Sequence, residues 1–179
     1  MGIVEPDDLP ADRRETVAGS LRLAVKLAKT ERFGHRPAEH RERECYLSGF
    51  AALRYWIDGL LDEPRYADLT QDNWFMPALA NGYCYGCLYS TRLAAEKYLR
   101  EVADDYEEPI RSRLAQIADL YQQEHEMLGR KRPEYGCAWS LQPWRIGGPD
   151  KWTPQIRRAE AEALGEALAI ERQAVAKIE

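Results

Sequence analysis

The sequence predicts an all-α protein: a single-domain bundle of about five helices with one long aromatic-rich loop. Three observations favour this fold class. Apolar residues recur at intervals of three and four in five segments, no segment alternates as a half-buried strand does, and turn-forming residues stand between the segments. At 179 residues the chain is long enough for one sizeable core. We therefore expect one domain over 1–179, with residues 1–10 as a loose lead-in and 132–152 as a long loop or lid.

The first two helices are expected at 11–30 and 38–62, joined by a connector over 31–40 that contains Gly34 and Pro37. Helical spacing predicts the buried positions of the first helix: Val17, Leu21, Val25 and Leu27 or Ala28. On the second helix the apolar positions form an amphipathic stripe: Tyr46, Phe50, Leu53, Ile57 and Leu60. Pro64 closes this helix.

Three longer helices are expected at 77–106, at 108–131 and from residue 153 to the C-terminus. Pro77 suits the first position of a helix, where its missing N–H needs no partner. Thr153 suits the N-cap position in front of Pro154. The buried face of the helix over 108–131 is marked by Ile110, Leu114, Ile117, Tyr121 and Leu128.

Composition excludes several classes of protein. The formal net charge of −5 and the isoelectric point near 5.4 argue against a nucleic-acid partner. No apolar run approaches the ~18 residues of a membrane span, so no membrane association is expected. The polar N-terminus lacks the apolar region of a secretory signal. We therefore expect a cytoplasmic protein, in which the four cysteines are reduced, metal-bound or catalytic.

The stretch "NGYCYGCLYS" (81–90) contains a C-x-x-C pair, Cys84 and Cys87. Both share helical spacing with Thr91, Ala95, Tyr98 and Val102, so we expect the two thiols on a buried stripe. Three interpretations follow. The thiols pack in the core, they form a redox pair whose first pKa is lowered by a helix N-terminus, or they bind a metal. The sequence offers no second C-x-x-C for a metal, and Cys45 and Cys137 could contribute only through tertiary proximity, so we name no metal site.

Polar residues interrupt the apolar stripes of two helices. Glu124 follows Tyr121 in phase, and Glu171 lies among Leu164, Leu168, Val175 and Ile178. A carboxylate in a core must be paired, hydrogen-bonded or protonated. Candidate networks are Glu171 with Arg54 or Arg92, and Glu124 with a tyrosine hydroxyl. In the alternative, the helices are rotated slightly and both glutamates reach solvent.

Histidines are sparse, and no common catalytic motif is present. The chain lacks H-E-x-x-H, a paired E-x-x-H, a P-loop, G-x-G-x-x-G and G-x-S-x-G. A cysteine nucleophile needs a nearby base, and His125 is the only serious candidate.

Five stretches together resemble a known kind of domain: "SLRLAVKLAKT", "YLSGFAALRYWIDGLL", "NGYCYGCLYSTRLAAEKYLREVA", "ADLYQQEHEML" and "EALAIERQAVAKIE". The pattern Gly-x-x-Ala-x-x-x-Trp, then Arg-x-x-Ala-x-x-Tyr-Leu-Arg, falls on Gly49, Ala52, Trp56, Arg92, Ala95, Tyr98, Leu99 and Arg100. The chain resembles a poorly characterised all-helical domain. That domain occurs alone, beside effector-binding domains, or after the papain-like part of proteins similar to the butirosin-pathway acyltransferase. Because the papain-like part is missing here, the resemblance implies a helical module that holds a small molecule, without assured chemistry.

The leading hypothesis is therefore a non-enzymatic small-molecule-binding domain. Its pocket is expected between the helices at 38–62, 77–106, 108–131 and 153 onward, under the 132–152 loop. The expected aromatic walls are Trp56, Trp74, Tyr83, Tyr85, Trp139 and Trp144. The expected orienting groups are Arg54, Glu124 and Glu171.

The alternative hypothesis is a thiol-dependent enzyme, either a dithiol oxidoreductase or a hydrolase or transferase with Cys84 as nucleophile and His125 as base. It requires a thiol with a lowered pKa. A third hypothesis is an interaction module that forms a homodimer. The sequence identifies no cofactor.

Overall fold

The computed structural model describes residues 12–33, 46–131 and 152–179, and in these ranges the chain is almost entirely helical. The all-α prediction is confirmed. The elements, in chain order, are α1 (Arg13–Lys29), β1 (Arg32–Phe33), β2 (Tyr46–Leu47), α2 (Gly49–Leu61), α3 (Glu63–Tyr66), α4 (Phe75–Ala103), α5 (Ile110–Arg130) and α6 (Pro154–Ile178).

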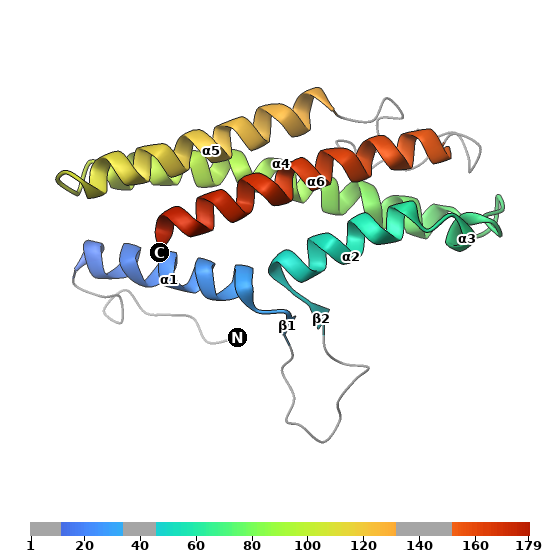
Figure 1. Cartoon of the computed structure of the whole chain (residues 1–179), viewed down its shortest axis with the longest axis horizontal. Coiled ribbons are helices and arrows are strands. Elements are labelled where there is room, and N and C mark those ends of the chain that lie inside the picture. Colours follow the sequence, from blue (N-terminus) through green and yellow to red (C-terminus); the bar gives the residue numbers. More distant parts are fainter. Residues whose placement is uncertain (1–11, 34–45, 132–151) are drawn as a thin grey trace, which may run out of the picture.

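The long helices run side by side as a bundle (Figure 1). α4 packs against α5, α5 against α6, and α6 against α2. The helices α1 and α2 follow one another along one side of α6, so that together they occupy the fourth position of the bundle (Figure 1). No helix in the described ranges is long and apolar enough to cross a membrane.

The core consists of two apolar clusters, one toward each end of the bundle. The cluster near α3 contains Tyr85, Leu128 and Leu164, which are completely or almost completely buried. The cluster near α1 contains Leu99, Ile117 and Ala174, together with Val17 of α1. Burial of the periodic apolar positions on α4, α5 and α6 thus holds the three long helices together.

Helix α2 starts later than expected, and this corrects the prediction of a helix over 38–62. Tyr46 and Leu47 pair antiparallel with Phe33 and Arg32, although no strand was expected. Tyr46 is 77% exposed and does not belong to the apolar stripe of the helix. Residues 38–45 of the expected helix lie outside the described residues. The prediction failed because the helical spacing was extended back to Tyr46, which belongs to a short β-ladder. The helix itself starts only at Gly49.

The ends of the other helices differ by only a few residues from the expected ones. α4 begins two residues before Pro77, and both ends of α5 and the start of α6 agree closely with the predictions. Ile110, expected on the buried face of α5, is 49% exposed because it is the first residue of that helix. The apolar stripe of α5 therefore starts one turn later, at Leu114.

Gly49 is required where α2 meets the end of α1. Its φ is +50°, and a Cβ at this position would lie 2.1 Å from the carbonyl oxygen of Ala28. We expect Gly49→Ala to lower the free energy of unfolding by about 2–3 kcal/mol, because the left-handed backbone and the clash with a backbone atom add. Urea unfolding followed by circular dichroism measures the change.

The matched control is Gly165→Ala in α6, where a Cβ would meet nothing within 4 Å. This substitution is expected to stabilise the protein by up to about 1 kcal/mol, because alanine favours a helix interior. Equal effects of the two substitutions would show that the contact between Gly49 and Ala28 is not formed.

Candidate functional site

An aromatic cavity of about 380 Å³ opens between α2, α3 and the first turns of α4. Helical spacing directs its lining inward: α2 contributes residues at 55, 56, 59 and 60, and α4 contributes residues at 77, 80, 81 and 84. The lining residues are Tyr55, Trp56, Gly59, Leu60, Arg65, Tyr66, Pro77, Ala80, Asn81, Cys84 and Trp152. Four of these eleven residues carry large aromatic rings, so the walls suit a flat apolar molecule.

A chain of hydrogen bonds fixes the indole rings of the cavity. Trp56 Nε1 donates to Asn81 Oδ1 at 2.8 Å, and Asn81 Nδ2 donates to Glu160 Oε1 at 3.0 Å. Trp152 Nε1 donates to Glu160 Oε2, also at 3.0 Å. Because an indole N–H can only donate, the amide of Asn81 can have only one orientation. These three hydrogen bonds tie α2, α4 and α6 together behind the cavity and hold both tryptophans in place before any ligand arrives.

The wall formed by Tyr66 and Trp152 is supported from behind by Arg157. The two rings meet edge to face, with centroids 5.2 Å apart. The guanidinium of Arg157 lies 4.1 Å from the Tyr66 centroid and donates to the carbonyl of Trp152 at 2.7 Å. It also pairs with Glu63. The short helix α3 is thus bound to α6, and it presents Tyr66 to the cavity at a fixed angle.

The cysteine pair does not lie where the sequence analysis placed it. Cys84 and Cys87 are both exposed, so the expectation of thiols on a buried stripe is wrong. The buried face of α4 is carried instead by Ala78, Tyr85 and Leu99, which corresponds to a helix rotated by about one residue. Cys84 lies at the cavity, whereas Cys87 points away from it toward Tyr83.

The electrostatics of the thiols do not favour a reactive cysteine. Cys84 lies beyond the second turn of α4, where the helix dipole has little effect. Partial burial, followed by the proximity of Cys87, raises the pKa of the Cys84 thiol. Tyr83 is 54% exposed, and its hydrogen bond with Cys87 raises the pKa of the Tyr83 phenol. In the described part of the chain, no group of three or more His, Cys, Asp and Glu residues could hold a metal.

His125 contacts Tyr89 and not the expected partner, Cys84. Its Nδ1 lies 3.0 Å from the carbonyl oxygen of Tyr89, and its ring stacks on the Tyr89 ring with centroids 3.8 Å apart. A backbone carbonyl accepts only, so Nδ1 carries the proton in this arrangement. The histidine therefore links α5 to α4 and does not line the cavity that contains Cys84.

Glu124 and Glu171 form a buried ion-pair network with Arg92. Arg92 Nε lies 3.2 Å from Glu124 Oε1, and its second nitrogen pairs with Glu171. The expected pair of Glu171 with Arg92 is confirmed, but Glu124 shares the same arginine, and no tyrosine hydroxyl among the described residues bonds to it. The guanidinium also lies 5.4 Å from the centroid of Tyr121. The network lies between the two apolar clusters and is separate from the cavity.

Burial sets the protonation of this network. Glu124 is completely buried, and its Oε2 accepts no hydrogen bond from the described residues. Burial and then the charge of Glu171 raise the pKa of Glu124 to about 8, although Arg92 opposes both effects. Burial also raises the pKa of Glu171. One guanidinium thus stabilises one carboxylate, and the other carboxyl group holds its proton at neutral pH.

Of the other expected ligand-binding residues that the structure describes, only Trp56 lines the cavity. Arg54 is exposed, and Tyr85 is buried in the core, where its hydroxyl donates to the carbonyl of Leu128 at 2.9 Å. Trp74 is likewise part of the core cluster. Trp139 and Trp144, with most of the expected 132–152 loop, lie outside the described residues. The orienting groups expected from α5 and α6, Glu124 and Glu171, are not in the described lining of this cavity, which comes from α2, α3, α4 and Trp152.

Two residues behind the cavity were missed although the sequence pattern contains them. The stripe of α6 through Leu164 and Leu168 continues one and two turns toward its N-terminus at Glu160 and Arg157. Both are buried. Extending the stripe would therefore have predicted them. No pattern would have predicted Tyr66 and Arg65, since they belong to a helix of only four residues.

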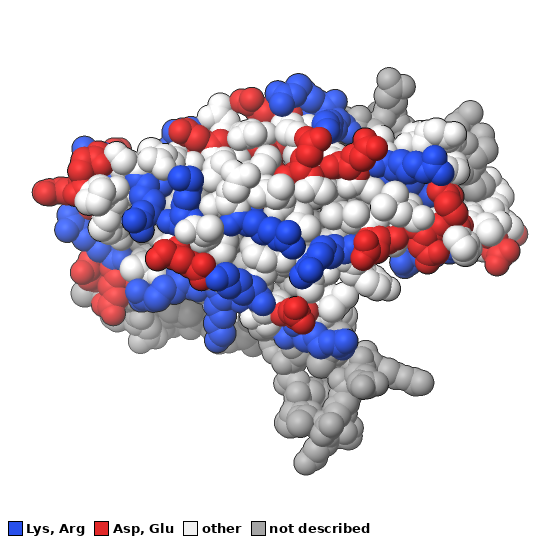
Figure 2. Space-filling model, viewed as in Figure 1, with Lys and Arg blue, Asp and Glu red and all other residues white. Residues whose placement is uncertain are grey.

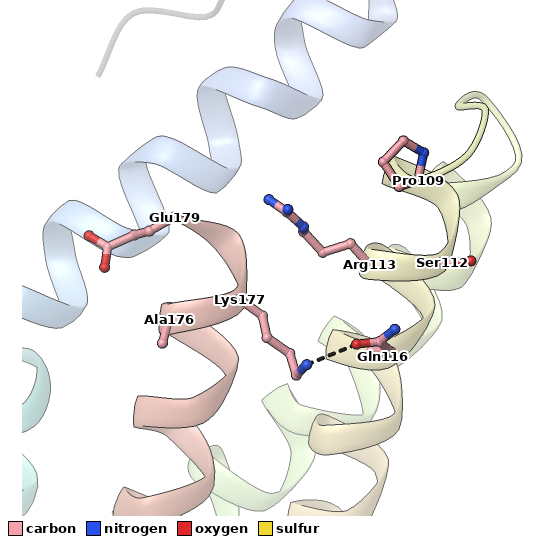
Figure 3. Close-up of a pocket in the computed structure, with 7 residues that line it drawn as sticks. All are labelled: Pro109, Ser112, Arg113, Gln116, Ala176, Lys177 and Glu179. Atoms are coloured by element: carbon pink, nitrogen blue, oxygen red, sulfur yellow. Dashed lines mark hydrogen bonds between the residues drawn. The ribbon is translucent and has the colours of Figure 1, made fainter.

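Two further cavities have a different character. One, of about 620 Å³, lies on the other side of Tyr66 and Trp152, next to Arg157. The other, of about 500 Å³, lies between the ends of α5 and α6 and is lined by polar side chains such as Gln116 and Lys177, with no aromatic ring (Figure 3). Lys177 crosses it to donate to Gln116 at 2.8 Å (Figure 3). The first of these cavities shares Tyr66 and Trp152 with the candidate site but faces the ion pair of Arg157 and Glu63, and only two aromatic rings belong to its described lining.

Comparisons of the chain with models of protein families, with curated proteins and with solved structures gave no match.

Proposed function

We propose that this chain is a small-molecule-binding helical domain and that its ligand occupies the cavity between α2, α3 and α4. The observation that supports this most directly is the hydrogen-bonded chain from Trp56 through Asn81 and Glu160 to Trp152. Buried polar groups of this kind cost stability unless they are fully paired. Here they orient the side chains that line an open, aromatic space, which is the arrangement of a preorganised binding site.

The size and chemistry of the cavity define a ligand class. Its volume of about 380 Å³ lies in the range of small-molecule sites, which begins at about 300 Å³. Tyr55, Trp56, Tyr66 and Trp152 offer ring faces and edges, so a flat aromatic ligand gains most from these walls. The ligand enters from solvent past Ala80 and Cys84, which are both exposed.

The thiol-dependent alternative gains no support from the geometry. It requires a lowered thiol pKa, and a hydrolase or transferase also requires a histidine base, but the pKa of Cys84 is raised and His125 bonds to Tyr89. We therefore assign Cys84 to the wall of the cavity, in a cytoplasmic protein whose thiols stay reduced.

The position of Cys84 provides a direct test. A ligand in the cavity is expected to slow alkylation of Cys84 by N-ethylmaleimide at least severalfold, because it covers the thiol. Cys87 lies three residues away and outside the cavity, and its rate is expected to stay unchanged. Peptide mass spectrometry gives both rates in the same sample, with 2-naphthol and 2-naphthoate as probes. Equal rates for Cys84 with and without saturating probe would contradict the proposal.

The charged side chains on one face of the molecule indicate whether that face suits a small molecule or a nucleic acid (Figure 2). Acidic and basic side chains are interspersed on the face that α1, α2 and α6 present, and neither sign forms a continuous stripe (Figure 2). A nucleic-acid backbone binds to a concentrated basic surface. This face therefore supports a small-molecule partner over a nucleic acid.

A further inference from the structure

Among the described residues that line the cavity, one carries a charge, and this side chain suggests the charge of the ligand. It is the guanidinium of Arg65. We propose that the ligand is an aromatic carboxylate whose ring lies between the tryptophan and tyrosine walls and whose carboxylate binds the guanidinium of Arg65. This inference rests on the proposed function and specifies the substrate class of the same site.

Arg65 is positioned by the backbone of α2. A Cβ built on Gly59 would lie 2.9 Å from Arg65 Nη1, so the guanidinium occupies the space that a side chain at this position would fill. The tight connection between α2 and α3 at Asp62 turns the chain back and brings Arg65 over Gly59. Arg65 thus lines the cavity while it stays exposed to solvent.

An acid fits this site better than a cation does. Aromatic rings also bind cations, and a carboxylate on the wall would strengthen the binding of a cation. The buried carboxylate behind the tryptophans, Glu160, is not among the lining residues, and its two oxygens accept from Asn81 and Trp152. Among the described lining residues, a ligand cation would therefore meet Arg65 and no acidic side chain. An anion meets a fork of N–H donors suited to bidentate binding.

The overall charge of the protein makes this preference specific to the site. The formal net charge is −5, so the protein as a whole repels an anion. Any preference for an acid must arise locally, and Arg65 is the lining residue able to provide it.

The test compares three probes with the same ring: 2-naphthoate, 2-naphthol and 2-naphthylmethylammonium. Isothermal titration calorimetry on the full chain is expected to show that wild type binds the acid about tenfold more tightly than the alcohol. Arg65→Gln is expected to lower affinity for the acid to that for the alcohol and to leave the alcohol unaffected. Gly59→Ala retains the charge but displaces the guanidinium, so it is expected to weaken binding of the acid more than binding of the alcohol.

Each outcome separates this inference from the proposed function. If the alcohol binds as tightly as the acid, or if Arg65→Gln changes nothing, the cavity binds ligands but Arg65 does not select acids. Tightest binding of the ammonium compound overturns the inference in favour of a cation site. If none of the three binds wild type, the proposed function fails together with the inference. Circular dichroism of both variants checks that they fold.

Discussion

Replacing Arg92 by methionine is expected to lower the free energy of unfolding by about 3–5 kcal/mol at pH 8. Arg92 is the cation shared by Glu124 and Glu171, whose side chains are 0% and 9% exposed. Without it both carboxyl groups must stay protonated in the folded protein, whereas both ionise on unfolding. The loss is therefore expected to shrink as the pH falls toward the ordinary glutamate pKa near 4.5. Urea unfolding at pH 5 and pH 8 measures it.

The control for this substitution is Arg100→Met on the same helix. Arg100 pairs with Glu96 and Asp119 at the surface, and its side chain is 41% exposed. Exposed ion pairs contribute little, so a loss below about 1 kcal/mol is expected. An Arg92→Met variant that loses no more than this control at pH 8 would show that the carboxylates near Arg92 are hydrated in solution.

Replacing Glu124 by glutamine is expected to stabilise the protein at pH 8 by about 2–4 kcal/mol. The pKa of Glu124 is about 8 in the folded protein and near 4.5 in the unfolded chain. Between these values the folded state binds one more proton than the unfolded state, so stability falls as the pH rises, by about 1.4 kcal/mol per unit. Glutamine has a similar shape and does not titrate, so this part of the pH dependence should disappear.

The measurement is the free energy of unfolding of both proteins at several pH values from 5 to 9. The difference between Glu124→Gln and wild type is expected to be small at pH 5 and to grow until about pH 8. Glu126→Gln on the same helix, with a side chain 52% exposed, serves as control and should leave the profile unchanged. A profile of Glu124→Gln parallel to that of wild type would contradict the protonation assigned to Glu124.

The bundle was predictable because its long helices carry strong periodic patterns. On α5, Leu114, Ile117, Tyr121 and Leu128 were correctly expected to be buried, and so were Leu164, Leu168 and Val175 on α6. The same reasoning singled out Glu124 and Glu171 as buried charges. A stripe with few interruptions identifies the buried face of a helix to within one residue. This was sufficient to predict the buried side chains of α5 and α6.

The N-terminal part of the buried face of α4 was predicted wrongly for a physical reason, whereas Val102 is buried as expected. Between Phe75 and Thr91 this helix contains no charged residue, so apolar and small side chains surround it on all sides. Periodicity then has no polar face to contrast with, and the stripe through Cys84 was as regular as the true one through Ala78 and Tyr85. Contacts with α5 select the buried face, and these are tertiary.

The sequence predicted an aromatic cavity but identified only a small part of the residues that line it. Trp56 was expected in an aromatic pocket and lines one. Tyr66, Arg65 and Trp152 reach the cavity through short segments whose spatial position depends on the packing of α3 against α6. Such long-range placement leaves no periodic signal in the sequence.

The central claim, that the cavity binds a small molecule, is tested most directly by filling it. Ala80 is an exposed lining residue of α4, so Ala80→Trp adds an indole to the cavity without disturbing the core. Calorimetric titration with the three naphthyl probes is expected to show binding of one molecule per wild-type chain, with a Kd on the order of 0.1 mM for the best probe. The variant is expected to keep the wild-type thermal midpoint and to bind none of them. Unchanged binding by the variant, or no binding by wild type, would contradict the claim.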